Sequence, residues 1–139
     1  MFTASRDGTC KIWRVAQDPD GQGLNLQSMG SFSAFNGVSV TSLDCLSWSE
    51  RSGLVLACGS ENGDICVFLI KDPALNIGVG FAVVPGANVS MIHATEPNLC
   101  HGSTVRKLKF SPHNGNSDSF VLASCGDDTS VRVFQYNRA

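Results

Sequence analysis

The sequence lacks an excess of charge of either sign. Its 139 residues include 10 Lys and Arg against 12 Asp and Glu, which gives a formal net charge of −2. A protein that binds nucleic acid mainly through phosphates concentrates positive charge to attract the polyanion. The charge balance therefore argues against nucleic acid as the main partner.

Long hydrophobic runs and paired cysteines are also missing. No window approaches 18 uncharged apolar residues, and no basic stretch followed by an apolar run opens the chain, so we expect neither a membrane span nor a signal peptide. No two of the six cysteines form a C-x-x-C pair, and most stand in apolar strand patterns. We expect buried, reduced thiols rather than a zinc site or a disulfide framework. The cysteines are Cys10, Cys45, Cys58, Cys66, Cys100 and Cys125.

Helical periodicity is the third absence. The chain consists of short runs of alternating apolar and polar residues, bounded by Gly, Pro, Asn and Asp, and no helix of ordinary length is indicated. Its length suits one domain. The sequence therefore predicts an all-β fold.

One stretch, residues 101–134, shows the organisation of the whole chain. It predicts three strands separated by a polar turn and a Gly-Asp-Asp turn. Its last part recurs: SRDGTCKIW ends at Trp13, SENGDICVF at Phe68 and GDDTSVRVF at Phe134. A short polar residue, suited to a hairpin turn, stands six positions before each aromatic. These polar residues are Asp7, Asn62 and Asp128.

The repeat divides the chain into three segments with different numbers of expected strands. Residues 1–36 form an incomplete unit of three strands, with a loop over 16–23. Residues 37–100 form a unit of about four strands with an insertion, in which 89–93 is an outer strand and 78–84 is a strand-like piece of uncertain placement. Residues 101–139 form a three-stranded unit that lacks its outer strand.

Two registers compete in the strand over residues 40–48, because a slip of one residue inverts the buried face. We favour the second of the two sets below, because its spacing recurs in residues 105–111. The competing sets of inward residues are Val40, Leu43 and Cys45, or Leu43, Leu46 and Trp48.

Repeats of short strands with a Gly/Asp turn before an aromatic resemble WD-repeat propeller blades. The spacing of 55 residues from Trp13 to Phe68 and 66 from Phe68 to Phe134 requires insertions between blades. The resemblance implies an incomplete WD-repeat β-propeller of about two and a half blades, with a structural tetrad in each blade. In the third copy the tetrad positions are His101, Ser124, Asp128 and Phe134; in the first they are Thr3, Asp7 and Trp13, without a His; the middle copy has Cys58, Asn62 and Phe68.

Several motifs are more particular than a generic WD repeat. FTASRDGTCKIW, VRKL and LASCGDDTSV resemble the C-terminal blades of the family of Elongator second subunits. The resemblance is weakest over residues 71–100. It implies a non-catalytic scaffold that binds other Elongator subunits, supports wobble-uridine modification of tRNA and resides in the cytoplasm and nucleus. It implies no cofactor, metal or small-molecule substrate. The alternative is a WD-repeat adaptor of an unrelated intracellular complex.

Two other functions compete with the scaffold. An enzyme could use Cys100 and His101, but adjacent residues rarely face each other, and no nucleophile elbow, P-loop or metal cluster is present. An accessory RNA contact could use basic residues near the third copy, although no aromatic platform interleaves with them. These are Arg106, Lys107 and Lys109, with Arg132 on a neighbouring strand.

Two and a half blades do not close a ring, and closure removes the unpaired edges of this architecture. We therefore expect the 139 residues to be part of a longer protein or an incomplete gene product. Expressed alone, they are expected to self-associate through edges near residues 2–5 and 131–136.

Overall fold

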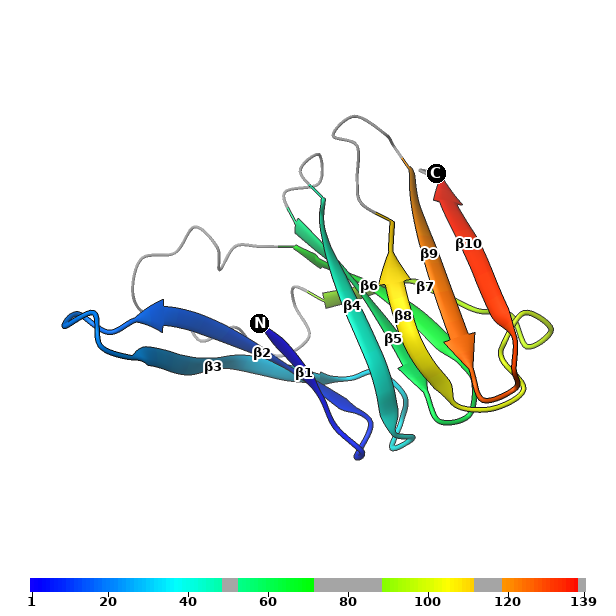
Figure 1. Ribbon diagram of the computed structural model, residues 1–139, viewed down its shortest axis with the longest axis horizontal. Helices are drawn as coiled ribbons and strands as arrows, with labels where there is room; N and C mark the ends of the chain where they lie inside the picture. Colours follow the sequence, from blue (N-terminus) through cyan, green and yellow to red (C-terminus); the bar gives the residue numbers. More distant parts are fainter. Residues whose placement is uncertain (49–52, 72–88, 112–118, 138–139) are drawn as a thin grey trace.

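The computed structural model describes residues 1–48, 53–71, 89–111 and 119–137, and these residues form ten β-strands (Figure 1). No helix occurs in the described ranges, which confirms the predicted all-β fold. The expected piece at 78–84 lies outside the described residues. In chain order the strands are β1 Phe2–Ala4, β2 Thr9–Gln17, β3 Leu24–Ser33, β4 Val40–Trp48, β5 Gly53–Ser60, β6 Ile65–Lys71, β7 Val89–Ala94, β8 Val105–Phe110, β9 Ser119–Gly126 and β10 Val131–Asn137.

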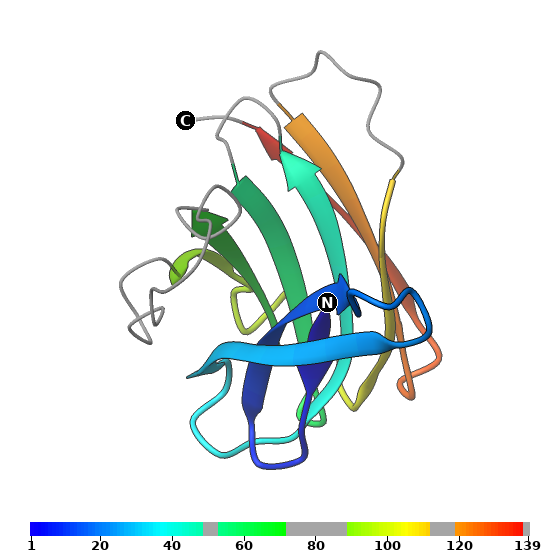
Figure 2. The same ribbon diagram turned by 90° about the vertical axis from the view of Figure 1, so that its left-hand side faces the viewer.

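The strands form three antiparallel sheets. The first sheet has the order β1-β2-β3, the second β4-β5-β6-β7 and the third β8-β9-β10. The sheets lie side by side in chain order (Figure 1), and Figure 2 looks onto the first sheet with the other two behind it. The leading strands touch in series, because β1 contacts β4 and β4 contacts β8. The fold is a partial propeller of about two and a half blades, as the repeat predicts.

Each gap between neighbouring sheets holds one hydrophobic core. The side chains of β5 and β6 alternate between the two cores, because successive residues of a strand point to opposite faces. The core between the second and third sheets consists of Val55, Ala57, Ile65, Val67, Leu69, Val105, Leu108, Phe110, Phe120 and Leu122. The core between the first and second sheets consists of Cys10, Ala34, Val40, Leu56, Cys58, Cys66, Phe68 and Ile70.

The second sheet is therefore covered on both faces, which changes the register question for β4. Leu43 packs against the core shared with the first sheet, and Leu46 packs against the core shared with the third. The favoured set is wrong in placing these two residues on one face, and the competing set is wrong for Cys45, which is exposed. A β-bulge between Val40 and Ser42 shifts the pairing within the strand. A choice of one inward face does not apply to a strand of a sheet that is buried on both sides.

Two hairpin turns require glycine. Gly8 has φ +83° and Gly63 has φ +97°, in the left-handed region that residues with a Cβ rarely adopt. A Cβ on Gly8 would lie 2.9 Å from the carbonyl oxygen of Phe35, and one on Gly63 would overlap the carbonyl oxygen of His101. Each turn therefore packs against the segment that leads into the next sheet. The Asn62-Gly63 hairpin signal thus fixes both a turn and a contact between sheets.

Candidate functional site

The tetrad positions of the third sheet meet in a buried hydrogen-bond network around His101, just before β8. Its Nδ1 lies 2.9 and 3.0 Å from the two carboxylate oxygens of Asp128, and its Nε2 lies 2.7 Å from Oγ of Ser124 in β9. An ionised carboxylate only accepts, so Nδ1 donates to Asp128 and, in the neutral imidazole, Nε2 accepts the hydroxyl proton of Ser124. The network ties the start of the third sheet to its middle strand and its last turn.

Asp128 is held by several donors in addition to His101. The backbone N–H of Gly102 donates to Oδ2 at 2.9 Å, and Ser130 donates its N–H at 3.1 Å and its hydroxyl at 2.8 Å to Oδ1. These hydrogen bonds, that of His101 first, hold the pKa of the Asp128 carboxyl well below its usual range despite its partial burial. The carboxylate is thus a fixed structural acceptor that closes the turn between β9 and β10.

Phe134, the aromatic position of this copy, adds packing instead of a hydrogen bond. Its ring packs against the core between the second and third sheets, and its centroid lies 6.4 Å from that of Tyr136. Phenylalanine has no donor to offer the network. The hydrogen-bond chain of the third copy therefore ends at the hydroxyl of Ser124.

The first copy has a shorter version of the arrangement. The indole Nε1–H of Trp13 donates to Oγ1 of Thr3 at 2.8 Å, which joins β2 to β1. Asp7 does not join that pair: its Oδ1 accepts the backbone N–H of Thr9 at 2.9 Å and the Thr9 hydroxyl at 2.7 Å. The structure thus brings Thr3 and Trp13 together and leaves Asp7 as a local turn residue.

The middle copy uses its positions for packing between sheets. Cys58 places its Sγ 3.6 Å from Sγ of Cys10, and the ring of Phe68 lies 5.0 Å, centroid to centroid, from that of Phe32 in β3. Asn62 stands in the turn, where its backbone N–H donates to Oγ of Ser60. In this copy Cys58 and Phe68 therefore join the second sheet to the first, while Asn62 stays a local turn residue.

A Ser-His-Asp arrangement invites comparison with a hydrolase triad, but its burial differs. His101 is 2% exposed and Ser124 is 3% exposed, so the hydroxyl and imidazole face protein instead of a substrate cleft. A nucleophile must reach the reacting atom, whereas this hydroxyl is enclosed between β8, β9 and β10. The geometry is that of a structural network.

The pair Cys100 and His101 does not form a catalytic couple either. The sulfur of Cys100 lies 3.2 Å from Oγ1 of Thr95 and 3.3 Å from Oδ1 of Asp64, while the imidazole is engaged with Asp128 and Ser124. Burial, together with the neighbouring Asp64 carboxylate, raises the pKa of the Cys100 thiol. A thiol in this setting is a poor nucleophile, because the thiolate is the reactive form.

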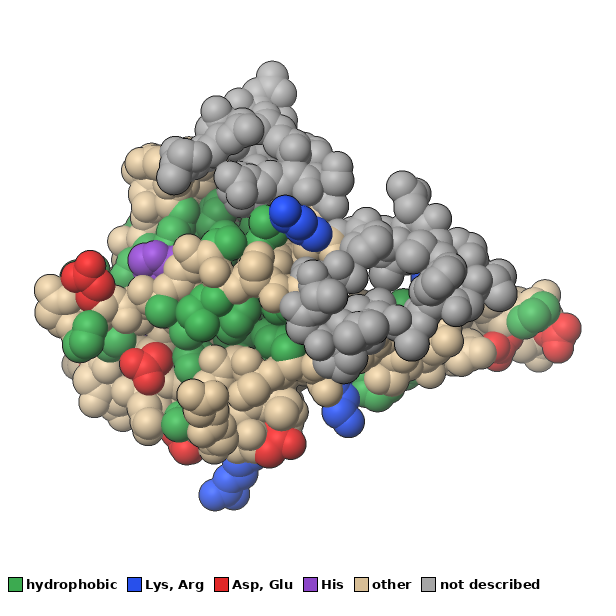
Figure 3. Space-filling model, turned by 180° about the vertical axis from the view of Figure 1, so that it is seen from behind, with side chains coloured by type: hydrophobic (Ala, Val, Ile, Leu, Met, Phe, Trp, Pro, Cys, Tyr) green, Lys and Arg blue, Asp and Glu red, His purple; other side chains and the backbone are tan. Residues whose placement is uncertain are grey.

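The basic residues near β8 lie close to carboxylates. Arg106 makes a bidentate pair with Asp127, with both N–O distances at 2.6 Å, and Lys109 lies 2.9 Å from Asp44. Among the described residues, Lys107 has no such partner. On the face shown in Figure 3 the Lys and Arg side chains stand apart from one another. Two of the three charges proposed for RNA contact are therefore balanced locally.

Side-chain hydrogen bonds also join the second sheet to the third. The local sequence patterns did not predict these contacts. The hydroxyl of Thr41 donates to the carbonyl of Val105 at 2.6 Å. Asp44 accepts the backbone N–H of Phe110 at 2.8 Å in addition to the ammonium of Lys109. Both residues stand on β4 and reach β8, the leading strand of the next sheet. Only a comparison of strands about 65 positions apart could have found them.

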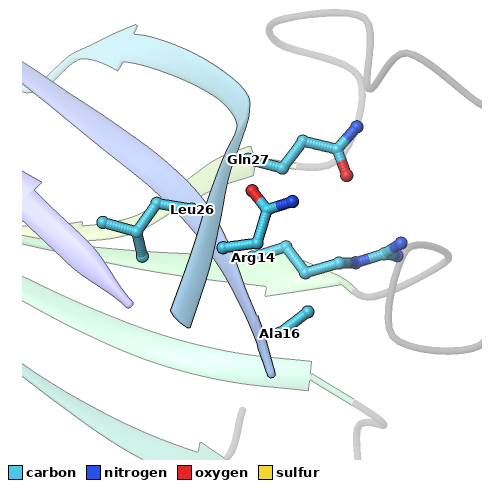
Figure 4. Close-up of a pocket in the computed structure, with 5 residues that line it drawn as sticks. Arg14, Ala16, Leu26 and Gln27 are labelled. Atoms are coloured by element: carbon cyan, nitrogen blue, oxygen red, sulfur yellow. The ribbon is translucent and has the colours of Figure 1, made fainter. Parts of the chain in front are cut away.

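A shallow cavity of about 410 Å³ lies beside β2 and β3 and is lined by Arg14, Ala16, Asn25, Leu26 and Gln27. Figure 4 shows Arg14 and Gln27 extending to the same side while Leu26 points away. Its lining holds one charged side chain and no second titratable group. The described lining therefore offers no carboxylate, imidazole or thiol that could act as a general acid or base.

Metal-binding clusters and membrane-spanning helices are both missing from the described ranges. No group of three or more His, Cys, Asp or Glu side chains there could hold a metal ion. No helix of the described part has the length and apolar character to cross a membrane.

Comparisons with known proteins agree with this geometry. Residues 95–135 match the family model "WD domain, G-beta repeat". The chain is 36% identical, over 96% of its length, to Elongator complex protein 2 of Arabidopsis thaliana, and 29% identical, again over 96%, to that of Drosophila melanogaster. It is 28% identical over 99% of its length to protein transport protein SEC13 of Coccidioides immitis. It spans 15% of each Elongator relative and 41% of the SEC13 relative.

Proposed function

Because the chain carries a WD repeat within a partial WD-repeat propeller, we propose that it is a non-catalytic scaffold of an Elongator-type complex. In this role it binds other subunits and supports wobble-uridine modification of tRNA by a separate catalytic subunit. The observation that carries the proposal is the similarity to Elongator complex protein 2, which extends over 96% of the chain in both relatives.

The side-chain geometry supports a scaffold over an enzyme. The side chains of Ser124, His101 and Asp128 are hydrogen-bonded within the third sheet and hold its strands together. The Cys100 thiol is surrounded by oxygen atoms. WD repeats as a class mediate contacts between proteins, with loops and strand edges as the binding surfaces. The chain contributes three antiparallel sheets whose ends carry such loops.

A segment exchange tests the Elongator assignment directly. The matching segment of Arabidopsis Elongator complex protein 2 is replaced by this chain, and the wobble nucleosides of tRNA are measured by mass spectrometry in cells that lack the native protein. We expect the modification to be retained and the other subunits to co-purify with the chimera. A chimera that carries the SEC13 segment is the matched control. A stable chimera that neither co-purifies nor restores modification would contradict the assignment.

The similarity to SEC13 supports a second candidate, a WD-repeat adaptor of an unrelated complex. The exchange experiment separates the two candidates. Restoration by both segments would show that any compatible blades suffice, which would favour the adaptor. Restoration by this chain alone favours the Elongator scaffold.

Direct contact with tRNA is an accessory element of the proposal. It rests mainly on Lys107, because carboxylates already pair with Arg106 and Lys109. One phosphate contact changes the logarithm of affinity by roughly 0.9 per decade of salt for duplexes and about 0.7 for single strands. Retention of tRNA that does not respond to salt, or that is unchanged by Lys107→Ala, would remove this contact.

A further inference from the structure

Two thiols from different sheets lie in contact in the core between the first and second sheets. Cys10 of β2 and Cys58 of β5 have their sulfur atoms 3.6 Å apart, and both side chains are 0% exposed. The two residues are 48 positions apart in the chain. All six cysteines lie in the described ranges as free thiols, and Cys66, which pairs with Cys58 across β5 and β6, is the competing partner.

The pair lies where the first and second sheets pack against each other. Cys10 and Ala34 are the residues that the first sheet region contributes to this core as buried side chains, and the other members belong to the second sheet. A bond between Cys10 and Cys58 would therefore join the two sheets at a central point of their contact. It would restrict how the first sheet moves relative to the second.

We propose that Cys10 and Cys58 are a redox pair that a peroxide converts into a disulfide, which locks the first sheet onto the second. In the first step the sulfur of Cys10 attacks one peroxide oxygen, the O–O bond breaks, one water leaves and Cys10 becomes a sulfenic acid. In the second step the Cys58 sulfur attacks the Cys10 sulfur, the S–O bond breaks, and a second water leaves with the Cys58 proton. The two thiols lose two electrons and two protons, and the peroxide is reduced to two waters.

The surroundings assign the first step to Cys10. The two thiols share one hydrogen bond; with the Cys58 S–H as its donor, the pKa of the Cys10 thiol is lowered against the opposing effect of burial, and that of Cys58 is raised. Burial adds to the increase at Cys58. The thiolate is the form that attacks peroxide, so Cys10 is the attacking residue and Cys58 the resolving one.

Access to the buried pair requires a local opening between the two sheets. The first sheet is suited to it, because most of its residues are exposed or half-buried while β5 and β6 are nearly all buried. Elements with few buried contacts open at a lower free energy than the whole molecule unfolds. The sulfur atoms must then approach from 3.6 Å to the roughly 2.05 Å of a disulfide bond.

Peptide mapping of the oxidised chain tests the proposal. The folded 139-residue chain is treated with graded hydrogen peroxide, free thiols are blocked, and the unreduced protein is digested with trypsin and Glu-C. Trypsin releases Cys10 in residues 7–11, and cleavage after Glu61 separates Cys58 from Cys66. We expect the Cys10–Cys58 link in at least tenfold excess over any other pair, and its loss on adding dithiothreitol.

Three controls make the result specific. Cys10→Ala should abolish the link, and Cys45→Ser, which alters an exposed thiol, should leave it unchanged. The same oxidation in concentrated urea should give mixed pairings, because the fold no longer selects partners. Equal pairing among all six cysteines in the folded chain, or oxidation of exposed thiols while Cys10 and Cys58 remain reduced, would overturn the proposal. The unmodified chain alone decides this, even if a variant fails to fold.

Discussion

Replacing Ser124 with Ala tests whether the buried histidine network is structural. Ser124 is 3% exposed and its Oγ lies 2.7 Å from Nε2 of His101, so the substitution leaves a buried imidazole nitrogen without its hydrogen-bond partner. An unsatisfied buried polar group costs about 1–3 kcal/mol. The change in side-chain volume is small, so we expect the free energy of unfolding to fall by roughly 2 kcal/mol, mainly from the lost hydrogen bond.

Urea denaturation followed by fluorescence measures this loss. A domain of this size has an m-value of about 2 kcal/mol per molar urea, so a loss of about 2 kcal/mol moves the midpoint by roughly 1 M. The reading requires coincident transitions by fluorescence and circular dichroism, which is the test of two-state unfolding. Co-purification with partner subunits should persist below the transition, because the hydroxyl does not reach the surface.

Ser42 supplies a matched control for the same substitution. Its hydroxyl is buried and has no hydrogen-bond partner among the described residues. Ser42→Ala removes no hydrogen bond, so we expect a change within about 0.5 kcal/mol or a slight gain in stability. Equal losses for the two variants would refute the argument from the network. Unchanged stability of Ser124→Ala, combined with loss of a chemical activity, would instead support a catalytic serine.

Three further predictions follow from the turns and the carboxylate. Gly63→Ala should lower the free energy of unfolding by at least about 1 kcal/mol, because the left-handed conformation is strained for Ala and its Cβ would overlap the His101 carbonyl, and thermal unfolding checks it. Thr129→Gly should raise stability by about 1 kcal/mol, because Thr129 has φ +61° and is exposed; an unchanged midpoint would contradict this. The lowered pKa of Asp128 gives stability that is present above its ordinary pKa of about 4 and is lost as the pH falls further, so Asp128→Asn should flatten the acid side of the stability curve.

The repeat made most of the fold predictable from sequence. Asn62-Gly63 and the Gly126-Asp127 turn separate runs of alternating residues, and hairpin chemistry of this kind acts locally. The structure has three antiparallel sheets of three, four and three strands. Among the tetrad positions, His101 is hydrogen-bonded to both Ser124 and Asp128, and Trp13 is hydrogen-bonded to Thr3.

The features that the sequence could not predict depend on which sheet covers which face of its neighbour. The pattern of β4 could not reveal that Leu43 and Leu46 serve different cores, because alternation distinguishes two faces without showing that both are buried. The contact between Cys10 and Cys58 joins residues of different repeats, and it depends on how two sheets pack. Long-range packing of this kind carries no local sequence signal.

The turns of the three copies show what the repeat preserves. In the first two copies a glycine, Gly8 or Gly63, lets the turn approach the segment that leads into the next sheet. In the third copy Thr129 takes this position, and the preceding Asp128 binds His101 at the start of its own sheet instead. The glycine position therefore couples two sheets in the first two copies, whereas in the third copy the residue before it, Asp128, closes its own sheet. A residue pattern that maintains the placement of sheets, and varies the polar groups within them, is what a scaffold requires and what a shared reaction centre would not tolerate.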